Sequence, residues 1–167
     1  MDEIFVPVRD FPRYAVSNHG RVQNVKTGRI LKGGKTRGYL TVVLCSVNGN
    51  MTCTVHRLVA QHFLPNPDNK REVDHVDGNP MNNYLSNLRW ATRGENQRNC
   101  KSRSGSSSKY LGITWHKRDN KWQAQIKIEG KRKHLGYFTD EVEAAKVYDA
   151  AAREHNGEFA RPNFPES

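Results

Sequence analysis

A run of eight residues without one apolar side chain divides the chain. Residues 101–108 contain five serines, one glycine and two basic residues, a composition typical of a flexible linker. Because a folded core needs apolar side chains to bury, no core is expected to continue through this run. The sequence therefore predicts small units on either side of residues 101–108 and not one large enzyme core.

The charge balance predicts a polyanionic partner. The 167 residues include 27 Lys and Arg against 17 Asp and Glu, for a net charge of +10, and such a field attracts nucleic acid. No stretch approaches the roughly 18 apolar residues of a membrane span, and the first residues are acidic where a secretory signal is basic. A soluble, cytoplasmic protein with no membrane partner is expected. Cys45, Cys53 and Cys100 form no C-x-x-C pair, so they are expected to be ordinary reduced thiols.

The first hundred residues predict short strands followed by a helix and a second pair of strands. Apolar runs between turn residues predict an antiparallel sheet with strands at 16–18, 21–25, 39–44 and 51–55. Apolar residues at helical spacing begin at Val55, and Pro65 ends that helix. Two further strands are predicted at 73–75 and 88–91, and a last helix at 93–99.

Residues 74–99 collect more short polar side chains than two strands and a helix need. These residues are Asp74, His75, Asp77, Asn79, Asn82, Asn83, Asn87, Glu95, Asn96 and Asn99. Each alone is commonly a turn former or a helix cap. Together they offer a histidine that can accept a proton from water, with carboxylate and amide oxygens of the kind that Mg²⁺ or Mn²⁺ binds. The region is either an elaborate turn or a hydrolytic site, and adjacent strand residues share a site only where the strand twists or ends.

Residues 55–60, 73–79 and 87–92, with Asn82, Asn83, Glu95 and Asn96, resemble the HNH endonucleases of phages and mobile introns. Residues 11–22 similarly resemble the NUMOD-like module that accompanies them. The resemblance implies a ββα-metal core in which His75 is the general base and Asn87 orients it. It implies Asp74 and Asn96 as ligands of one divalent cation, Mg²⁺ or Mn²⁺. The third HNH position is an asparagine, as in nicking members, and the zinc-binding cysteine pairs of some relatives are absent.

The segment from residue 109 predicts a basic three-stranded sheet and an acidic helix. Residues 122–128 alternate apolar and polar side chains, as do 111–117, and a third strand is expected at 131–138 after the turn at Glu129 and Gly130. Thr139 is expected to cap a helix whose inner stripe holds Val142, Ala145, Tyr148 and Ala152. Residues 109–138 carry a net charge of +6 and residues 139–167 one of −4, so a simple solubility role for the basic face is disfavoured.

Six short segments of this region resemble the Apetala/ethylene-response-factor DNA-binding domain: 110–113, 122–126, 134–138, 143–145, 148–152 and 163–165. The resemblance implies that the sheet enters the major groove of double-stranded DNA. The implied contact residues are Thr114, His116, Arg118, Gln125, Lys127, Arg132 and His134. Several arginines and a tryptophan of plant members are replaced here, so the target sequence does not transfer.

The sequence thus predicts an α+β protein with an N-terminal antiparallel β module (1–50), a ββα-metal HNH core (51–100), a linker (101–108) and a three-stranded antiparallel sheet packed on one helix (109–167). Its predicted function is site-specific, homing-type DNA cleavage, with a phage-infected cell as the setting. The alternatives are a non-catalytic DNA-binding regulator on the same scaffold and a nuclease that acts on RNA. Nicking or double-strand cleavage, and monomer or dimer, are left open by the sequence.

Overall fold

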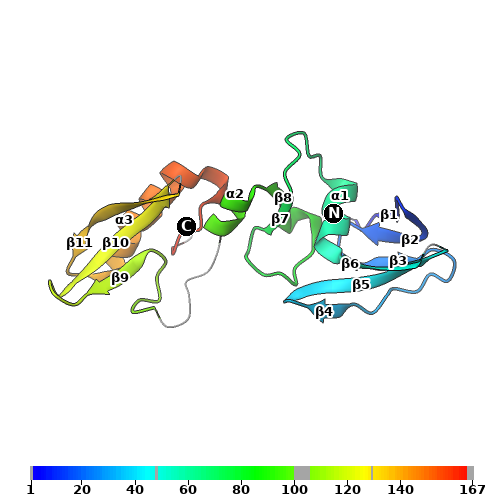
Figure 1. Cartoon of the computed structure of the whole chain (residues 1–167), viewed down its shortest axis with the longest axis horizontal. Coiled ribbons are helices and arrows are strands. Elements are labelled where there is room, and N and C mark those ends of the chain that lie inside the picture. Colours follow the sequence, from blue (N-terminus) through cyan, green and yellow to red (C-terminus); the bar gives the residue numbers. More distant parts are fainter. Residues whose placement is uncertain (1, 48, 100–105, 129, 165–167) are drawn as a thin grey trace. The chain divides into compact units, whose positions relative to one another are not determined.

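The computed structural model of the chain (Figure 1) describes residues 2–47, 49–99, 106–128 and 130–164. It divides into two compact units, Met1–Arg93 and Gly94–Ser167. Cys100, most of the predicted linker and Glu129 of the predicted turn lie outside the described residues. Across the described ranges, no helix is both long and apolar enough to cross a membrane.

The first unit begins with two antiparallel sheets of three strands. The first sheet holds β1 (Phe5–Val8), β2 (Phe11–Ser17) and β3 (Val22–Asn24), and the second holds β4 (Gly34–Thr36), β5 (Tyr39–Ser46) and β6 (Gly49–Thr54). The four strands predicted in this region overlap β2, β3, β5 and β6. The sequence prediction missed β1 and β4, because β1 contains a proline and β4 is a fully exposed Gly-Lys-Thr segment without apolar alternation.

A helix and a hairpin follow these sheets. They are α1 (Val55–Phe63), β7 (Glu72–His75), the 3-10 turn η1 (Leu85–Asn87) and β8 (Leu88–Ala91). The next helix, α2 (Arg93–Arg98), belongs from Gly94 onward to the second unit. As predicted, α1 ends before Pro65, and the Leu64 N–H closes its last turn on the carbonyl of Ala60 at 3.0 Å. β7 and β8 pair antiparallel, with His75 opposite Leu88 and Asp74 opposite Arg89.

One hydrophobic core joins the strands of the first fifty residues to the helix and hairpin that follow. Its buried members come from both predicted modules: Val8, Tyr14, Val16, Val22, Val42, Leu44, Val55, Leu58, Val59, Ala60, Val73 and Leu88. The predicted N-terminal module and the part of the predicted HNH core up to Arg93 therefore fold together as the first unit.

The second unit is an antiparallel sheet covered by a helix. The sheet order is β11 (Lys131–Phe138), β10 (Lys121–Ile128), β9 (Ile113–His116), and the helix α3 (Glu141–Asn156) is followed by the 3-10 turn η2 (Gly157–Phe159). Ala144 and Ala145 of α3 pack on Ile113 and Ala124 of the sheet. The α+β class and the three-stranded sheet packed on one helix are confirmed.

The start of α3 differs from the prediction in two details. Its N-cap is Asp140 and not Thr139, because the Asp140 carboxylate accepts a hydrogen bond from the Glu143 N–H at 2.7 Å. Val142 was expected in the inner stripe but is 36% exposed, and Ala144 takes the buried position instead. A small side chain is needed there for the helix to approach the sheet closely.

The serines that end the predicted linker belong to the second unit. Ser108 is buried, and its hydroxyl donates to Glu141 of α3 at 2.7 Å. The Ser107 hydroxyl accepts from the Trp115 N–H at 2.8 Å. Close by, Gly112 has a φ of +73°, and a Cβ there would overlap the ring of Tyr148. Residues 107–112 are thus an ordered entry to the sheet.

Candidate active site and nucleic-acid interface

The β7–β8 hairpin places the predicted Asp74 and His75 at consecutive positions of β7, in the interior of the first unit. Both side chains are buried, with 4% and 6% of the residue exposed. The guanidinium of Arg89, opposite Asp74 in the ladder, donates to Asp74 Oδ2 from Nε at 2.9 Å and from Nη2 at 2.7 Å. This buried ion pair compensates the charge of a carboxylate that would otherwise be costly to bury.

The His75 imidazole is held on several sides. Its Nε2 lies 3.3 Å from Oδ1 of Asn83. The ring of His56 meets it edge-on at 5.1 Å between centroids, and the ring of Tyr39 stacks at 6.1 Å. Burial lowers the pKa of His75, although Asn83 and the carboxylates of Asp77 and Asp74 act in the opposite direction. A lowered pKa favours the neutral form, which can accept a proton near neutral pH.

The buried Asn87 side chain bonds to the loop that follows His75. Its Nδ2 donates to Asp77 Oδ1 at 3.0 Å and to the Asn82 carbonyl at 2.8 Å, and its Oδ1 accepts from the Asp77 N–H at 3.0 Å. The sequence prediction gave Asn87 the task of orienting His75. In the structure the side-chain amide bonded to His75 is that of Asn83, and Asn87 shapes the loop between the two strands.

The Asp77 carboxylate accepts the hydrogen bonds that order the loop after β7. Burial raises the pKa of Asp77, but hydrogen bonds from Asn82, Asn79 and Asn87 outweigh it and the pKa is lowered. The ionised carboxylate accepts from the Asn82 side chain at 2.8 Å and from the Asn79 N–H at 2.7 Å. The cluster of asparagines that drew attention in the sequence thus serves in large part to order this loop.

His56, on the first turn of α1, is a residue that the sequence prediction passed over. It is 6% exposed, its Nδ1 has no hydrogen-bond partner among the described residues, and its ring also stacks on Tyr39 at 4.8 Å. Burial, with His75 and Arg57 nearby, lowers the pKa of His56 to about 4. The available signal was the position of His56 inside one of the matching segments. Tyr39 gave none, because it lies far away in sequence.

Asn96, the other predicted cation ligand, lies half-buried on α2. No group of three or more His, Cys, Asp or Glu side chains suited to a metal ion occurs in the described part of the chain. The predicted cation ligands, one carboxylate and one amide oxygen, do not amount to such a group. The predicted pair, Asp74 in the first unit and Asn96 in the second, consists of oxygen donors, the kind that a hard cation prefers.

The first β-sheet supports the loop that carries Asn83. Gly20, in the turn between β2 and β3, has a φ of +77°, and a Cβ there would lie 2.6 Å from Cβ of Asn83. The carbonyl of Asn18 accepts from the Leu85 N–H at 2.8 Å, and the ring of His19 packs on that of Tyr84 at 4.9 Å. The 18–20 turn therefore fixes the segment that contacts His75.

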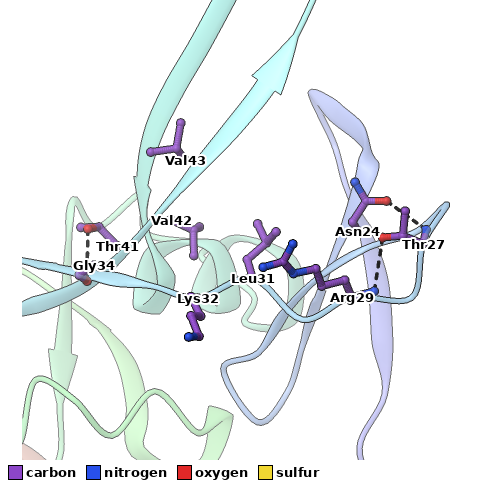
Figure 2. Close-up of a pocket in the computed structure, with 9 residues that line it drawn as sticks. All are labelled: Asn24, Thr27, Arg29, Leu31, Lys32, Gly34, Thr41, Val42 and Val43. Carbon is purple, nitrogen blue, oxygen red and sulfur yellow. Dashed lines mark hydrogen bonds between the residues drawn. The ribbon is translucent and has the colours of Figure 1, made fainter.

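A hollow in the same unit lies between the loop after β3 and strand β5. Figure 2 shows Arg29 and Lys32 at this loop, with Leu31 between them and Val42 of β5 opposite. The loop is ordered by the Asn24 side chain, which accepts from the Thr27 N–H at 3.1 Å. None of the residues predicted for catalysis lines this hollow. It adds two basic groups to the surface of the first unit.

The outer face of the second unit's sheet carries the predicted DNA contacts. The register aligns Thr114 with Gln123, Gln125 with His134, and Lys127 with Arg132, which places these side chains on the face opposite α3. His116 shares the face, and Arg118 lies in the β9–β10 turn with 86% of its side chain exposed. The seven predicted residues therefore come from one face and its adjoining turn.

Two further residues occupy the centre of this face. The Gln123 amide lies 3.2 Å from Nδ1 of His134, and the ring of Tyr137 packs between those of His134 and His116 at 4.6 and 5.2 Å. The sequence prediction missed Gln123 and Tyr137, although strand alternation puts Gln123 on the polar face. Tyr137 was missed because of a bulge in the β10–β11 ladder: Ala124 pairs with Gly136 and Gln125 with His134, so Leu135 is an extra residue that shifts the alternation along β11.

Two family models match the first hundred residues. Residues 3–45 match the NUMOD4 motif, and residues 53–98 match the model described as HNH endonuclease. Protein 3.8 of Escherichia phage T7 is 37% identical over 89 residues, which cover 53% of this chain and 73% of that protein. The fold, the hairpin and these matches define the class: the chain belongs to the HNH endonuclease family and carries a NUMOD module.

Named relatives and one solved structure agree with this class. An uncharacterized HNH endonuclease of Acanthamoeba polyphaga mimivirus is 44% identical over 80 residues, 48% of this chain and 24% of that protein. DNA endonuclease I-HmuI of Bacillus phage SP01 is 43% identical over 91 residues, 54% of this chain and 52% of that protein. A structure titled "DNA binding and cleavage by the HNH homing endonuclease I-HmuI" matches with a TM-score of 0.54 and 38% identity over 57% of this chain and 56% of that one. The chain spans about half or less of the length of these HNH relatives.

The C-terminal resemblance has a distant counterpart. The AP2-like ethylene-responsive transcription factor CRL5 of Oryza sativa subsp. japonica is 31% identical over 103 residues, 60% of this chain and 15% of that protein.

Proposed function

We propose that this chain is a metal-dependent, homing-type DNA endonuclease that acts in a host cytoplasm. The observation that carries the proposal is the buried Asp74–His75 pair on β7, within a segment that matches the HNH endonuclease model. A neutral imidazole beside a carboxylate offers a proton acceptor next to a cation ligand. Hydrolysis of a phosphodiester needs both groups at one place.

In this proposal His75 accepts a proton from the water that attacks the phosphorus. The bond to the leaving sugar oxygen breaks, and that oxygen takes a proton from solvent. Asp74 and Asn96 would hold the divalent cation, Mg²⁺ or Mn²⁺, which supplies stabilisation of negative charge when bound. Two hydrogen bonds from the Arg89 guanidinium hold the Asp74 carboxylate in place, and the Asn87 side chain holds the 77–82 loop closed. The predicted role of Asn87 as the residue that orients His75 becomes indirect, through this loop.

The sheet of the second unit is proposed to bind double-stranded DNA. Its outer face combines a basic rim of Arg118, Lys127 and Arg132 with a centre of Gln123, His134 and Tyr137. Basic groups bind phosphate without sequence preference, whereas amides and imidazoles can bond to base edges. We propose that residues 109–167 act as a separate binding domain, so that modest contacts by each unit add to a useful affinity.

A plasmid-nicking assay tests the catalytic proposal. Supercoiled plasmids carrying candidate target sites are incubated with the full chain and Mg²⁺ or Mn²⁺, with EDTA in the control. We expect nicked or linear product only with metal, and none from His75→Ala, which should keep its DNA affinity. Cleavage by His75→Ala at the wild-type rate would remove His75 from the mechanism.

The same assay separates the two alternatives. Salt-sensitive DNA binding without cleavage on every suitable target would identify the non-catalytic regulator. Cleavage of a structured RNA but not of the matching DNA duplex would identify an RNA-directed nuclease.

A further inference from the structure

One amide on the outer face of the second unit's sheet is held in place by a neighbouring side chain. Gln123 lies on β10, the middle strand, and alternates with the buried Ala124, so its half-buried side chain faces away from α3. Gln123 Nε2 lies 3.2 Å from Nδ1 of His134 on the neighbouring strand β11. An amide NH₂ group can only donate a hydrogen bond, so Nδ1 of His134 is the acceptor.

The imidazole that orients this amide is itself held by packing. The ring of His134 contacts that of Tyr137 at 4.6 Å between centroids, and the ring of His116 meets that of Tyr137 edge-on at 5.2 Å. Nδ1 of His116 in turn lies 3.2 Å from Oδ2 of Asp119. A row of side chains across the three strands therefore limits the movement of His134, and through it the movement of the Gln123 amide.

The groups that remain on the Gln123 amide match one base. The bond to His134 uses one of the two N–H groups, and the Gln123 side chain makes no other hydrogen bond within the described part of the chain. One donor and the acceptor Oε1 are left side by side. In the major groove adenine presents the complementary pair, an acceptor at N7 and a donor at N6, whereas guanine presents acceptors at both N7 and O6.

Gln125, two residues further along β10, has the same side chain without this support. It lies on the same face, but its side chain is hydrogen-bonded to none of the described residues. A glutamine that becomes ordered only on DNA loses side-chain entropy when it binds. The Gln123 side chain is already ordered in the folded chain, so it is the better candidate for selecting a base.

The position of Gln123 on the sheet suits a contact with a base. Strands lie about 4.8 Å apart, so three of them span roughly 10 Å, which is less than the roughly 12 Å width of the major groove. β10 lies between β9 and β11 (Figure 1), which places Gln123 on the centre line of the face. Arg118 precedes it in the β9–β10 turn, and Lys127 pairs with Arg132 beyond it. Basic side chains at both ends can bind phosphates and leave the central amide for base edges.

We infer that Gln123 is a specificity-determining residue that binds the N6 and N7 edge of one adenine in the major groove, with His134 as the positioning residue of its amide. The inference rests on the proposed DNA binding by the second unit. It adds the base that the outer face selects and the residue that selects it.

Selection from a random duplex library tests the base preference. The full chain is mixed with duplexes that carry a randomised central segment, in EDTA so that no metal-dependent cleavage occurs, and the bound duplexes are sequenced. We expect one A·T pair at which replacement by G·C weakens wild-type binding about 10-fold. Replacing that adenine by 7-deazaadenine, which lacks the N7 acceptor, or by purine, which lacks the N6 amino group, should also weaken binding.

Three variants assign the preference to Gln123. Gln123→Ala should bind the A·T and G·C duplexes equally well. Gln123→Glu, whose carboxylate only accepts hydrogen bonds, should favour cytosine at that position. Gln125→Ala is the matched control, because it removes the same side chain from the same strand and face. It should keep the preference for adenine at the selected pair, whatever its overall affinity.

His134→Phe tests the positioning role. It keeps an aromatic ring against Tyr137 but removes the Nδ1 acceptor. We expect its preference for adenine to lie between those of the wild type and Gln123→Ala. In the background of Gln123→Ala the same substitution should have no further effect on this preference, because the two residues act through one amide. Additive effects of the two substitutions would contradict the positioning role.

Controls keep the outcomes distinct. Thermal unfolding is measured for each variant, either Gln123 variant suffices for the comparison, and the modified bases test the contact with the wild type alone. A preference for adenine that persists in Gln123→Ala and Gln123→Glu, or a selected sequence without such an A·T pair, contradicts the inference and leaves DNA binding by the second unit standing. If no duplex binds, or if Arg132→Ala leaves the affinity unchanged, the proposed DNA binding is contradicted and the inference with it.

Discussion

Two histidines from different elements meet inside the first unit, and their burial gives them properties that neither has in water. His56 begins α1, His75 ends β7, and their ring centroids are 5.1 Å apart. A charged imidazole here would be poorly solvated and would face a second titratable ring. The pair is therefore expected to be neutral at physiological pH, as a proton-accepting site requires.

Acid should destabilise the fold through His56. The pKa of His56 is lowered from its ordinary value of 6.5 to about 4. Below pH 6.5 the unfolded chain binds a proton that the folded chain does not, so stability present above pH 6.5 is lost as the pH falls towards 4, by up to about 3 kcal/mol. In His56→Phe this loss should disappear.

Urea unfolding of both proteins at several pH values, followed by NMR signals of α1, measures this difference. At pH 7.5 neither state of the wild type carries the charge on His56, so that pH supplies the baseline. Parallel stability curves for wild type and His56→Phe between pH 7.5 and 4.5 would contradict the assignment.

For individual residues, the sequence indicated the candidate catalytic residues better than the residues that contact them. Asp74 and His75 follow from the chemistry of adjacent short polar residues in a matching segment. Asn83 and Asn87 are both asparagines in the same loop, and only the folded loop determines which amide reaches the imidazole. His56 and Tyr39 contact His75 across long sequence separations, which no local pattern reports.

The hairpin formed by β7 and β8 is the element on which the proposed chemistry depends. Its cross-strand pair, Asp74 and Arg89, is buried, with 5% and 16% of the two side chains exposed. Removing one partner of a buried ion pair leaves an uncompensated charge, whereas removing both need not cost stability.

Arg89→Met should therefore destabilise the first unit by about 3–5 kcal/mol. Asp74→Asn/Arg89→Met should recover a large part of this loss, because no lone charge is left in the interior. Chemical denaturation of the two variants, of Asp74→Asn and of the wild type at pH 7 completes a double-mutant cycle. A loss from Arg89→Met within 1 kcal/mol of zero would show that the pair contributes little.

The C-terminal segment is fastened to α3 by one buried carboxylate. Asp149 is 2% exposed and accepts from Asn163 N–H at 2.7 Å, Asn163 Nδ2 at 2.9 Å and Phe164 N–H at 2.8 Å. The Asn163 side chain in turn accepts from the Leu111 N–H at 2.6 Å. This network closes the entry and the exit of the second unit on each other.

Asp149→Ala should destabilise the second unit by about 3 kcal/mol, because three donors lose a charged acceptor. Asp140→Ala removes the N-cap on the same helix and should cost only about 1 kcal/mol. Thermal unfolding followed by the fluorescence of Trp115 and Trp122 compares the two variants. Equal losses would contradict the special role of Asp149.

Strand and helix positions were largely predictable, and their ends were not. Alternation identified β9 and β10, the turn residues at 129–130 identified β11, and helical spacing identified α1. The cap of α3 was misassigned by one residue, because Thr139 and Asp140 are both good caps and the choice is made by which side chain reaches the Glu143 N–H. β4 is fully exposed and has no apolar alternation from which a strand could be predicted.

The net charge differs in size and sign between segments of the chain. Residues 1–108 carry a net +8, residues 109–138 a net +6 and residues 139–167 a net −4. If the second unit binds DNA as proposed, a basic sheet backed by an acidic helix would direct the phosphates to the sheet side.

Salt dependence of DNA binding tests this sorting. Arg132→Ala removes one cation from the outer face and should reduce the slope of log affinity against log salt by about one. Lys146→Ala removes one positive charge from an exposed position of α3, on the other side of the sheet, and should leave the slope unchanged. Fluorescence anisotropy with a fluorescent duplex from 50 to 200 mM salt, a range of about fourfold, resolves the difference. Equal effects of the two variants would mean that the face is not used.

Gly20 and Asn83 are in close contact, although they belong to segments that match two separate family models. A chimera that takes its first fifty residues from another family member would place a different turn against the loop that carries Asn83, and any side chain at the position of Gly20 would collide with Asn83. Exchange of such modules is therefore restricted to pairs in which the turn at residue 20 fits the loop at residue 83. An engineered exchange has to redesign the turn and the loop together.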